Sequence, residues 1–356
     1  MSAIEVNGGV ATVESVALVA QTYLADRPLI VLGSGASVAH GLPGMGPLAH
    51  HILRTIGPRT RSGDDQTAWA KFSDLLNRTQ DLERSLSEAP LSNSLLSEVI
   101  AETWSAISEP DLKLHEQLVS GRTALPLTRY LRHLLRTANP NVSVVTTNYD
   151  RLAEYAADLA ETRASTGFEG GWIQHFDDAA LKVGTGSRPR IQVFKPHGSL
   201  DWFLDRSGEV RAVPLPTAIP PDCQPLIVTP GISKYQKTHA DPFRTVTALA
   251  DESLKRAASF LCIGYGFGDE HIHPVLRRRI RTDRVPIVVL ARTLTSSARS
   301  VVVDAAVPRF LAIEARGTDA KIYCPQYRSG VVLHGSELWK LSDFLNLVLG
   351  PESDAP

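Results

Sequence analysis

Cysteine is scarce in this chain. Its three cysteines, Cys223, Cys262 and Cys324, stand far apart and form no Cys-x-x-Cys pair. A zinc ribbon held by four thiolates needs four cysteines, so the count alone excludes one. No disulfide framework is indicated either, and we expect reduced thiols in a reducing compartment.

A charge excess of one sign and long apolar runs are also missing. The 37 lysines and arginines nearly balance the 38 aspartates and glutamates. Direct nucleic-acid binding is therefore not expected, and we interpret Arg277-Arg-Arg-Ile-Arg281 as a solvated helix face, with a local basic patch as the alternative. No stretch reaches the roughly 18 apolar residues of a membrane span, and no signal-like N-terminus is seen. We expect a cytoplasmic protein without membrane attachment.

Apolar runs alternate with helical spacing over most of the chain. Helical spacing covers 10–24, 151–159 and 234–256, a helix is expected to start near Pro274, and 164–188 is expected to be a long loop. Strands are expected at 28–32, 142–147, 190–194, 259–263 and 285–290, and more weakly at 226–228, 321–323 and 331–333. Continuous apolar strands are typical of a parallel sheet that is covered on both faces.

The predicted fold class is therefore α/β, with a doubly wound parallel, Rossmann-like sheet and no zinc ribbon. A helical insertion is expected over 60–137, where Leu, Glu, Arg and Ser dominate. We assign 1–350 to one domain and 351–356 to a disordered tail.

A glycine-rich turn follows the first expected strand, in the segment Arg27-Pro-Leu-Ile-Val-Leu-Gly-Ser-Gly-Ala-Ser37. Because Gly33 and Gly35 carry no side chains, a diphosphate can approach the main chain, where free N–H groups and a helix dipole favour negative charge. The same pattern is also an ordinary tight connection in any α/β protein. Taken alone, the turn leaves both interpretations open.

Polar or glycine-rich segments follow four of the expected strands. They are 33–37, 146–150, 196–199 and 264–269. In a doubly wound sheet, ligands bind beyond the carboxyl ends of the strands. Four such clusters at corresponding strand ends predict a single binding crevice.

The order of these segments resembles the sirtuin superfamily. The chain shows Gly-x-Gly-x-Ser, Gly-Leu-Pro, Thr-Thr-Asn-Tyr-Asp, Pro-His-Gly-Ser and Ile-Gly-Tyr-Gly-Phe-Gly-Asp in succession. More narrowly, it resembles the sirtuin-like domains of bacterial antiphage defence proteins over roughly residues 29–292. The resemblance implies a Rossmann-type domain that binds NAD and breaks the bond between nicotinamide and ribose.

The resemblance also implies roles for individual residues. Asn148, Asp150 and His197 would be catalytic. The residues implied to bind the dinucleotide are Gly33, Ser34, Gly35, Ala36, Ser37, Thr147, Gly264, Tyr265 and Gly266.

The chemistry of the three catalytic candidates fits such a reaction. An amide such as Asn148 can orient ribose hydroxyls or a water without adding charge, and Asp150 can accept a carboxamide N–H or stabilise developing positive charge. A histidine, with an ordinary pKa of about 6.5, can take a proton from water at neutral pH. Structural alternatives remain, since Asn-Tyr-Asp is also a helix N-cap and His197-Gly198 could form a turn.

The chain departs from protein-deacetylating sirtuins. The zinc cysteines are absent. After Gly41-Leu-Pro43, deacetylating sirtuins have an aromatic-Arg pair, whereas this chain has Gly44-Met-Gly-Pro47. The stretch after His197, Gly-Ser-Leu-Asp-Trp202, lacks their usual peptide-binding pattern. These departures argue against an acyl-lysine groove and make water the expected acceptor. The hypothesis is an NAD⁺ hydrolase that gives nicotinamide and ADP-ribose and acts in antiphage defence by NAD depletion. The alternatives are an NAD or ADP-ribose sensor without turnover, and a deacylase or ADP-ribosyltransferase.

NAD is thus expected as substrate, and no metal is expected. Asp269-Glu-His-Ile-His273 offers possible ligands, but their spacing is poor for one helix face, and the segment is interpreted as a helix cap. A homo-oligomer is expected, because an enzyme that destroys NAD must be silent until triggered. The resemblance also suggests a translocase-type (HerA-like) ATPase as partner, and 60–137 is the candidate interface.

Overall fold

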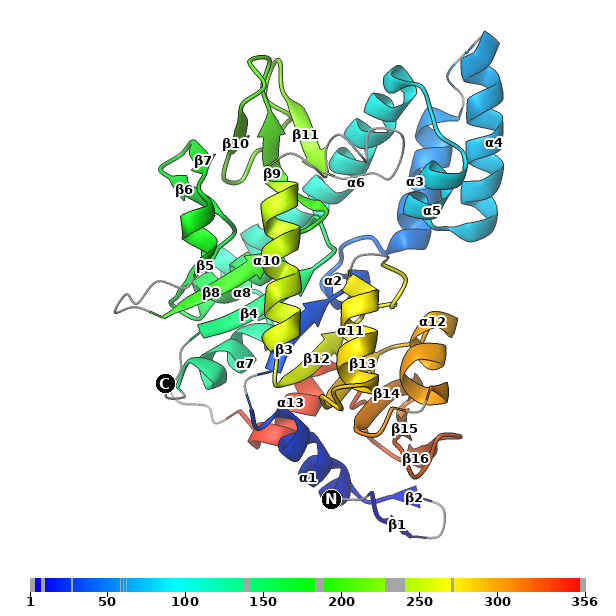
Figure 1. Cartoon of the computed structure of the whole chain (residues 1–356), viewed down its shortest axis with the longest axis vertical. Helices are drawn as coiled ribbons and strands as arrows, with labels where there is room; N and C mark the ends of the chain where they lie inside the picture. The colour runs from blue at the N-terminus through cyan, green and yellow to red at the C-terminus, as the bar shows by residue number, and fades with distance from the viewer. Residues whose placement is uncertain are drawn as a thin grey trace.

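The computed structural model places a large, mostly parallel sheet at the centre of the molecule (Figure 1). It describes residues 4–352 except 8, 9, 27, 58, 60, 62, 137–140, 183–188, 228–240, 270, 271 and 306. The strand order is β1-β2-β16-β15-β14-β13-β12-β3-β4-β8-β5. The strands from β14 to β5 in this order pair in parallel. Their bounds are β3 Pro28–Leu32, β4 Asn141–Thr146, β5 Arg163–Ser165, β8 Arg190–Phe194, β12 Ser259–Ile263, β13 Ile287–Ala291 and β14 Phe310–Arg316.

The sheet continues beyond β14 with short strands in mixed directions. β15 is antiparallel to β14 and β16 is antiparallel to β15, while β2 runs parallel to β16 and β1 antiparallel to β2. Their bounds are β15 Asp319–Tyr323, β16 Val331–Leu333, β2 Val10–Ala11 and β1 Val6–Asn7. The parallel part therefore ends at β14.

Helices cover both faces of the parallel strands. Alternate residues of β3 enter different cores: Ile30 packs in one cluster and Val31 in the other. Since all five residues of β3 are buried, the strand is covered on both sides. One face carries α1 Val13–Leu24, α7 Pro126–Leu135, α8 Leu152–Leu159 and α13 Leu341–Leu349, and the other carries α10 Phe243–Arg256, α11 Ile272–Arg281 and α12 Ser296–Ala298 with η2 Arg299–Asp304. The predicted doubly wound α/β class is confirmed.

The sequence between β3 and β4 is largely helical, as predicted. Figure 1 shows α3, α4 and α5 grouped at one corner of the molecule, while α6 runs back towards the sheets. Trp104 of α6 donates from Nε1 to the main-chain oxygen of Leu200 at 2.7 Å, which ties α6 to the neighbouring sheet. The bounds are α2 Ser34–Val38, α3 Met45–Ile56, α4 Gly63–Thr79, α5 Leu82–Glu88 and α6 Asn93–Val119.

A second, antiparallel sheet was missed by the sequence analysis. Its order is β11-β9-β10-β7-β6, and the prediction of a long loop over 164–188 is wrong for the described part of that segment. The strands there have three residues each, too few to show a period of two, and they pair with segments distant in sequence. The bounds are β6 Phe168–Gly170, β7 Gln174–Phe176, β9 Gly198–Leu204, β10 Val210–Ala212 and β11 Gln224–Ile227, with η1 at Asp178–Leu181.

Smaller corrections concern element ends. The first helix begins at Val13 rather than at residue 10, because the Thr12 side chain accepts from the Ser15 N–H and caps it. The strand β14 was not predicted, since Leu, Ala, Glu and Arg in that segment are good helix formers. Pairing with β13 and β15 overrides that propensity. The expected positions Val228, 234–240 and 353–356 lie outside the described residues.

The chain reverses its direction of winding beside β3. From β3 it proceeds to β4 and β8 on one side, and later it places β12, β13 and β14 on the other. Leu32 is level with Thr146 on one neighbour and with Ile263 on the other, so the carboxyl ends of these strands coincide. Such a switch point is where ligands bind in doubly wound sheets. Among the described helices, none combines the length and apolarity that a membrane crossing needs.

Candidate active site

The structure brings the four predicted strand-end segments together at the switch point. The turn after β3 contacts the loop after β4 through Asn148, whose Nδ2 donates to the Gly33 oxygen at 2.9 Å. It also contacts the end of β12, where the Gly35 N–H donates to the Gly264 oxygen at 3.1 Å. The turn after β8 reaches the β12 segment through His197 and Asp269. The expectation that these segments share one place in the fold is thus confirmed.

Glycine is required where β3 and β12 end, because two main chains touch there. A Cβ on Gly33 would lie 2.5 Å from the Gly264 oxygen, and one on Gly35 would lie 2.8 Å from the Gly264 Cα. Gly264 itself has φ +57°, and its Cβ would lie 2.3 Å from the Ala36 nitrogen. Since all these neighbours are backbone atoms, no side-chain movement can make room. The glycines fix the contact between the two turns.

Three main-chain N–H groups in the turn after β3 already donate to other main-chain oxygens. The Gly33 N–H donates to the Ile263 oxygen, the Gly35 N–H to the Gly264 oxygen and the Ala36 N–H to the Gly33 oxygen. The expectation of free N–H groups is therefore wrong for these three residues. Ser34 is half-buried and Gly35 is exposed, so the turn still presents surface to a ligand.

A buried relay links Asn148, Ser37 and Asp150. Asn148 Nδ2 donates to Ser37 Oγ at 2.9 Å as well as to Gly33, and Ser37 Oγ donates to Asp150 Oδ2 at 2.7 Å. Both amide hydrogens of Asn148 are then in use, so its remaining polar group is the acceptor Oδ1. The arrangement orients the amide so that it offers an oxygen rather than a nitrogen.

Asp150 has a structural role in addition to any chemical one. Its Oδ1 accepts from the Leu152 N–H at 3.1 Å, so Asp150 supports the start of α8 from the position before the N-cap residue, Arg151. Burial raises the pKa of this carboxyl, while the nearby Lys195 charge and the Ser37 hydrogen bond act in the opposite direction. Asp150 therefore positions both Ser37 and the first turn of α8.

His197 is paired with a carboxylate that the sequence analysis assigned only to helix capping. Its Nε2 lies 2.7 Å from Asp269 Oδ2, and both side chains are buried. The other oxygen of Asp269 accepts from the Ile272 N–H at 2.6 Å, so the residue also caps α11 as interpreted. A buried carboxylate on an imidazole fixes the ring orientation and stabilises the charge that the ring gains on taking a proton. The signal was available, since Asp269 ends the glycine-rich segment after β12.

A fully buried lysine joins the β4 and β8 ends. Lys195 Nζ donates to the Asp150 main-chain oxygen at 2.5 Å and to Glu154 Oε1 at 2.9 Å. The Leu200 N–H donates to the Tyr149 oxygen at 3.0 Å and adds a main-chain tie. His197 and Asn148 therefore sit on two segments that are bonded to each other.

A second buried ion pair connects the helical region to this loop. Asp111 of α6 is fully buried and accepts from the Arg151 main-chain N–H and Nε, both at 2.9 Å, and from Nη2 at 2.5 Å. Its Oδ2 also accepts from the Tyr155 hydroxyl at 2.6 Å. Burial alone would lower the pKa of Arg151, but the pKa is raised, because Asp111, Tyr155 and Asp201 together outweigh burial. The sequence analysis missed this pair because its partners are 40 residues apart.

The remaining candidates line the same region without a resolved chemical role. Thr147 is half-buried, and Tyr265 is buried with its ring 4.9 Å from that of Phe267. The Gly266 oxygen accepts from Thr295 Oγ1 at 2.6 Å. These contacts position the loop after β12, and its contact with a dinucleotide stays a prediction.

No group of three or more candidate metal ligands occurs among the residues described, which do not include Glu270 and His271.

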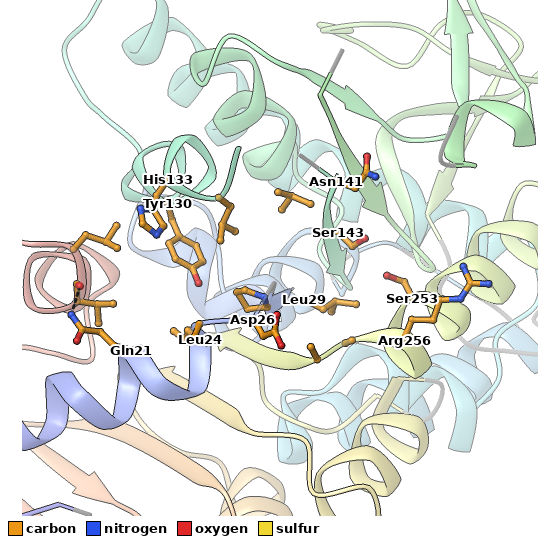
Figure 2. A pocket seen from close by; sticks show the side chains of 18 residues that line it. Gln21, Leu24, Asp26, Leu29, Tyr130, His133, Asn141, Ser143, Ser253 and Arg256 are labelled. Carbon is orange, nitrogen blue, oxygen red and sulfur yellow. Dashed lines mark hydrogen bonds between the residues drawn. The ribbon is translucent and has the colours of Figure 1, made fainter. Parts of the chain in front are cut away.

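A cavity of about 970 Å³ lies far from the catalytic candidates, at the amino ends of β3 and β4 (Figure 2). Its lining includes Tyr130, His133 and Ser143. Because ligands of doubly wound sheets bind at the opposite edge, we do not assign the reaction to it.

Comparison with known proteins bears on the family. Residues 142–302 match the model of the SIR2-like domain, a stretch that holds Asn148, Asp150, His197 and Asp269. This stretch, which is less than half of the chain, is therefore similar to a SIR2-like domain. A search of curated proteins found no match.

Solved sirtuin structures resemble the chain distantly. A Sir2 homologue in complex with NAD is 14% identical, with 79% of this chain and 84% of that chain covered and a TM-score of 0.39. A triple mutant of Sir2 homologues with 2'-O-acetyl ADP ribose is 15% identical, with 79% and 86% covered and a TM-score of 0.37. The assignment of the fold rests on the strand order described above.

We predict that Gly264→Ala destabilises the protein by about 2–4 kcal/mol, because it adds both left-handed strain and a backbone clash. Gly268→Ala is the matched control on the same loop, since its Cβ would meet nothing within 4 Å. The check is urea unfolding followed by far-UV circular dichroism. Equal midpoints for the two variants would show that the contact between the turns is not tight.

We also predict that Asp111→Leu lowers the free energy of unfolding by about 3–5 kcal/mol, because it leaves the Arg151 guanidinium buried without its counter-charge. Glu109→Gln, an exposed change on the same helix, should have an effect below about 0.5 kcal/mol. Chemical denaturation measures both. A loss no larger than that of the control would contradict the assigned role.

Proposed function

We propose that the protein is an NAD⁺ hydrolase that cleaves the bond between nicotinamide and ribose. The observation that carries the proposal is the meeting of two buried polar pairs, Asn148 with Ser37 and His197 with Asp269, at the switch point of the sheet. The match of 142–302 to the SIR2-like domain supports NAD as the substrate.

Asn148 is assigned to the ribose. Cleavage of an N-glycosidic bond passes through a transition state with positive charge on the sugar, so orienting dipoles accelerate it. With both amide hydrogens held by Gly33 and Ser37, Oδ1 is the atom that accepts from a ribose hydroxyl or a water. A preorganised neutral acceptor needs no rearrangement when the charge develops.

His197 is assigned as the general base. The imidazole takes a proton from water as the water oxygen bonds to C1′ of the ribose and the bond to nicotinamide breaks. Asp269 holds the ring and stabilises the imidazolium. NAD⁺ and water thus give nicotinamide, ADP-ribose and one proton, which the imidazole releases to solvent.

Water as the acceptor follows from what the chain lacks. Its three cysteines cannot build the four-thiolate zinc ribbon of deacetylating sirtuins. The diphosphate is assigned to the half-buried Ser34 and exposed Gly35 side of the turn after β3. Asp150 is assigned to positioning, since Ser37 and the Leu152 N–H occupy its two oxygens.

We further propose that the activity serves antiphage defence by depleting NAD. The sequence resemblance supports this role and suggests self-assembly or a translocase-type ATPase as the trigger. The helical region is the proposed interface for such a partner, because Asp111 on α6 holds the residue directly after Asp150. A partner that moves α6 would thereby act on the catalytic loop.

The test is incubation of the purified chain with NAD⁺, followed by chromatography of the products. The chain is tested alone and together with the protein that the neighbouring gene encodes. Asn148→Ala and His197→Ala should each lower kcat by about 10²–10⁴-fold. Asp269→Asn should lower kcat with little change in KM, because asparagine still caps α11 but loses the charge. Asp283→Asn, which touches only the surface pair with Arg279, is the control and should leave turnover unchanged.

The products separate the proposal from its competitors. Free nicotinamide with ADP-ribose supports hydrolysis, whereas acyl-ADP-ribose or modified protein would show group transfer to another acceptor. Tight binding of NAD⁺ with no turnover in any assembly would identify a sensor. Unchanged turnover in both Asn148→Ala and His197→Ala would refute the site.

A further inference from the structure

One face of α11 gathers arginines that the proposed reaction does not use. Arg277, Arg278 and Arg281 are exposed, and Arg281 comes four residues after Arg277 and three after Arg278, which makes it a neighbour of both on the helix surface. The opposite side, which includes Leu276 and Ile280, is buried in the core. The solvated helix face expected from sequence is confirmed, and its charge is concentrated rather than scattered.

The arginines line a groove whose described lining residues include no acidic side chain; Glu270 is not among the described residues. The groove has a volume of about 580 Å³ and is lined by His273, Pro274, Arg277, Arg278, Arg281 and Thr282. In the part of the chain that the structure describes, these three arginines form no ion pair. The neighbouring Arg279 differs, because it donates to Asp283 at 2.8 Å and to the Ala257 oxygen at 2.6 Å. The fold thus neutralises one arginine of the run and leaves the others to solvent.

A polar atom in the same groove also has no protein partner. His273 Nε2 is inaccessible to solvent and makes no hydrogen bond to any described residue. Other buried polar atoms of the described chain share this property, so His273 contributes to the groove as a lining side chain only.

The surroundings favour phosphate over a protein surface. Protein interfaces are centred on exposed apolar or aromatic side chains, with charge at the rim. The large exposed apolar residues of the described chain lie on other elements, and none is on α11. Guanidinium groups are suited to phosphate oxygens, which they can bind through two parallel hydrogen bonds.

We propose that the arginine face of α11, formed by Arg277, Arg278 and Arg281 around His273, binds the phosphate backbone of a nucleic acid. Successive phosphates of one strand can each meet one guanidinium, and no base contact is required. From the balanced total charge, direct nucleic-acid binding was not expected. However, dissolved ions screen charges that are farther than about 10 Å away, so the attraction between a phosphate and this helix depends on the charge close to it. The proposal is independent of NAD hydrolysis.

The experiment is fluorescence anisotropy of the full chain with labelled DNA of about 20 nucleotides, single-stranded and as a duplex, at several salt concentrations. Three phosphate contacts predict that raising the salt from about 50 mM to about 200 mM weakens duplex binding roughly 40-fold. The double variant Arg277→Gln/Arg281→Gln should lose about two units of the salt slope and at least about tenfold in affinity at the lower salt.

The matched control is Arg54→Gln/Arg316→Gln, which removes the same charge from two exposed arginines on other elements. Circular dichroism on both variants checks that they are folded. Retained binding in the control together with the loss on α11 supports the proposal.

Four results would overturn it. The first three are absence of binding at the lower salt, equal loss in both double variants, and equal or tighter binding of a poly-glutamate peptide of matched length. A mononucleotide or inorganic pyrophosphate that binds as tightly as the DNA would also overturn it, since the groove would then hold an isolated phosphate group rather than a polymer.

Discussion

The buried pair between Asp111 and Arg151 is the interaction on which the geometry of the site depends. One carboxylate receives the backbone N–H and two side-chain nitrogens of the same arginine, together with the Tyr155 hydroxyl. Burying both charges costs several kcal/mol per ion, and only such complete satisfaction offsets it. Arg151 directly follows Asp150, so this pair holds the loop after β4, which carries Asn148 and Asp150. The helix that provides Asp111 is α6, which is not one of the helices that cover the large sheet.

The glycine turn has a different role from the one that its pattern suggested. Gly33 and Gly35 are needed primarily because the main chain of Gly264 lies against them, and much of the turn's hydrogen bonding is directed to protein. This contact holds together the ends of β3 and β12, the two strands at the switch point. A dinucleotide would therefore meet a preformed surface and would not have to order a loose loop, which lowers the entropic cost of binding.

Much of the fold could be predicted because it is written in local patterns. Strands such as Pro28–Leu32 and Ser259–Ile263 are continuous apolar runs, and their buried positions follow directly from that composition. Only β11 of the second sheet was expected, as a weak strand at 226–228, and β6 and β7 could not be predicted because strands of three residues with glycine and polar side chains carry no periodic signal. Their order comes from partners such as Trp202, whose ring lies 4.8 Å from that of Phe168.

The site divides in the same way. The candidates at Asn148 and His197 could be found because each stands in a short polar segment after an apolar strand. Their supports could not be found. Lys195 and Asp111 have ordinary surroundings in the sequence, and only the folded chain brings them to within hydrogen-bond distance of the loop after β4. Asp269 lies between these cases, since its capping role was foreseen and its bond to His197 was not.

The double engagement of Asp269 has a mechanical consequence. One oxygen accepts from the Ile272 N–H at the start of α11 and the other lies against the imidazole, so the ring that follows β8 is also held from α11. α11 packs on α10, and its buried face, with Ile272, Leu276 and Ile280, joins the core on this side of the sheet. Because Asp269 contacts both α11 and the imidazole, a movement of α11 would be transmitted to the ring. The orientation of the proposed general base thus depends on the position of α11.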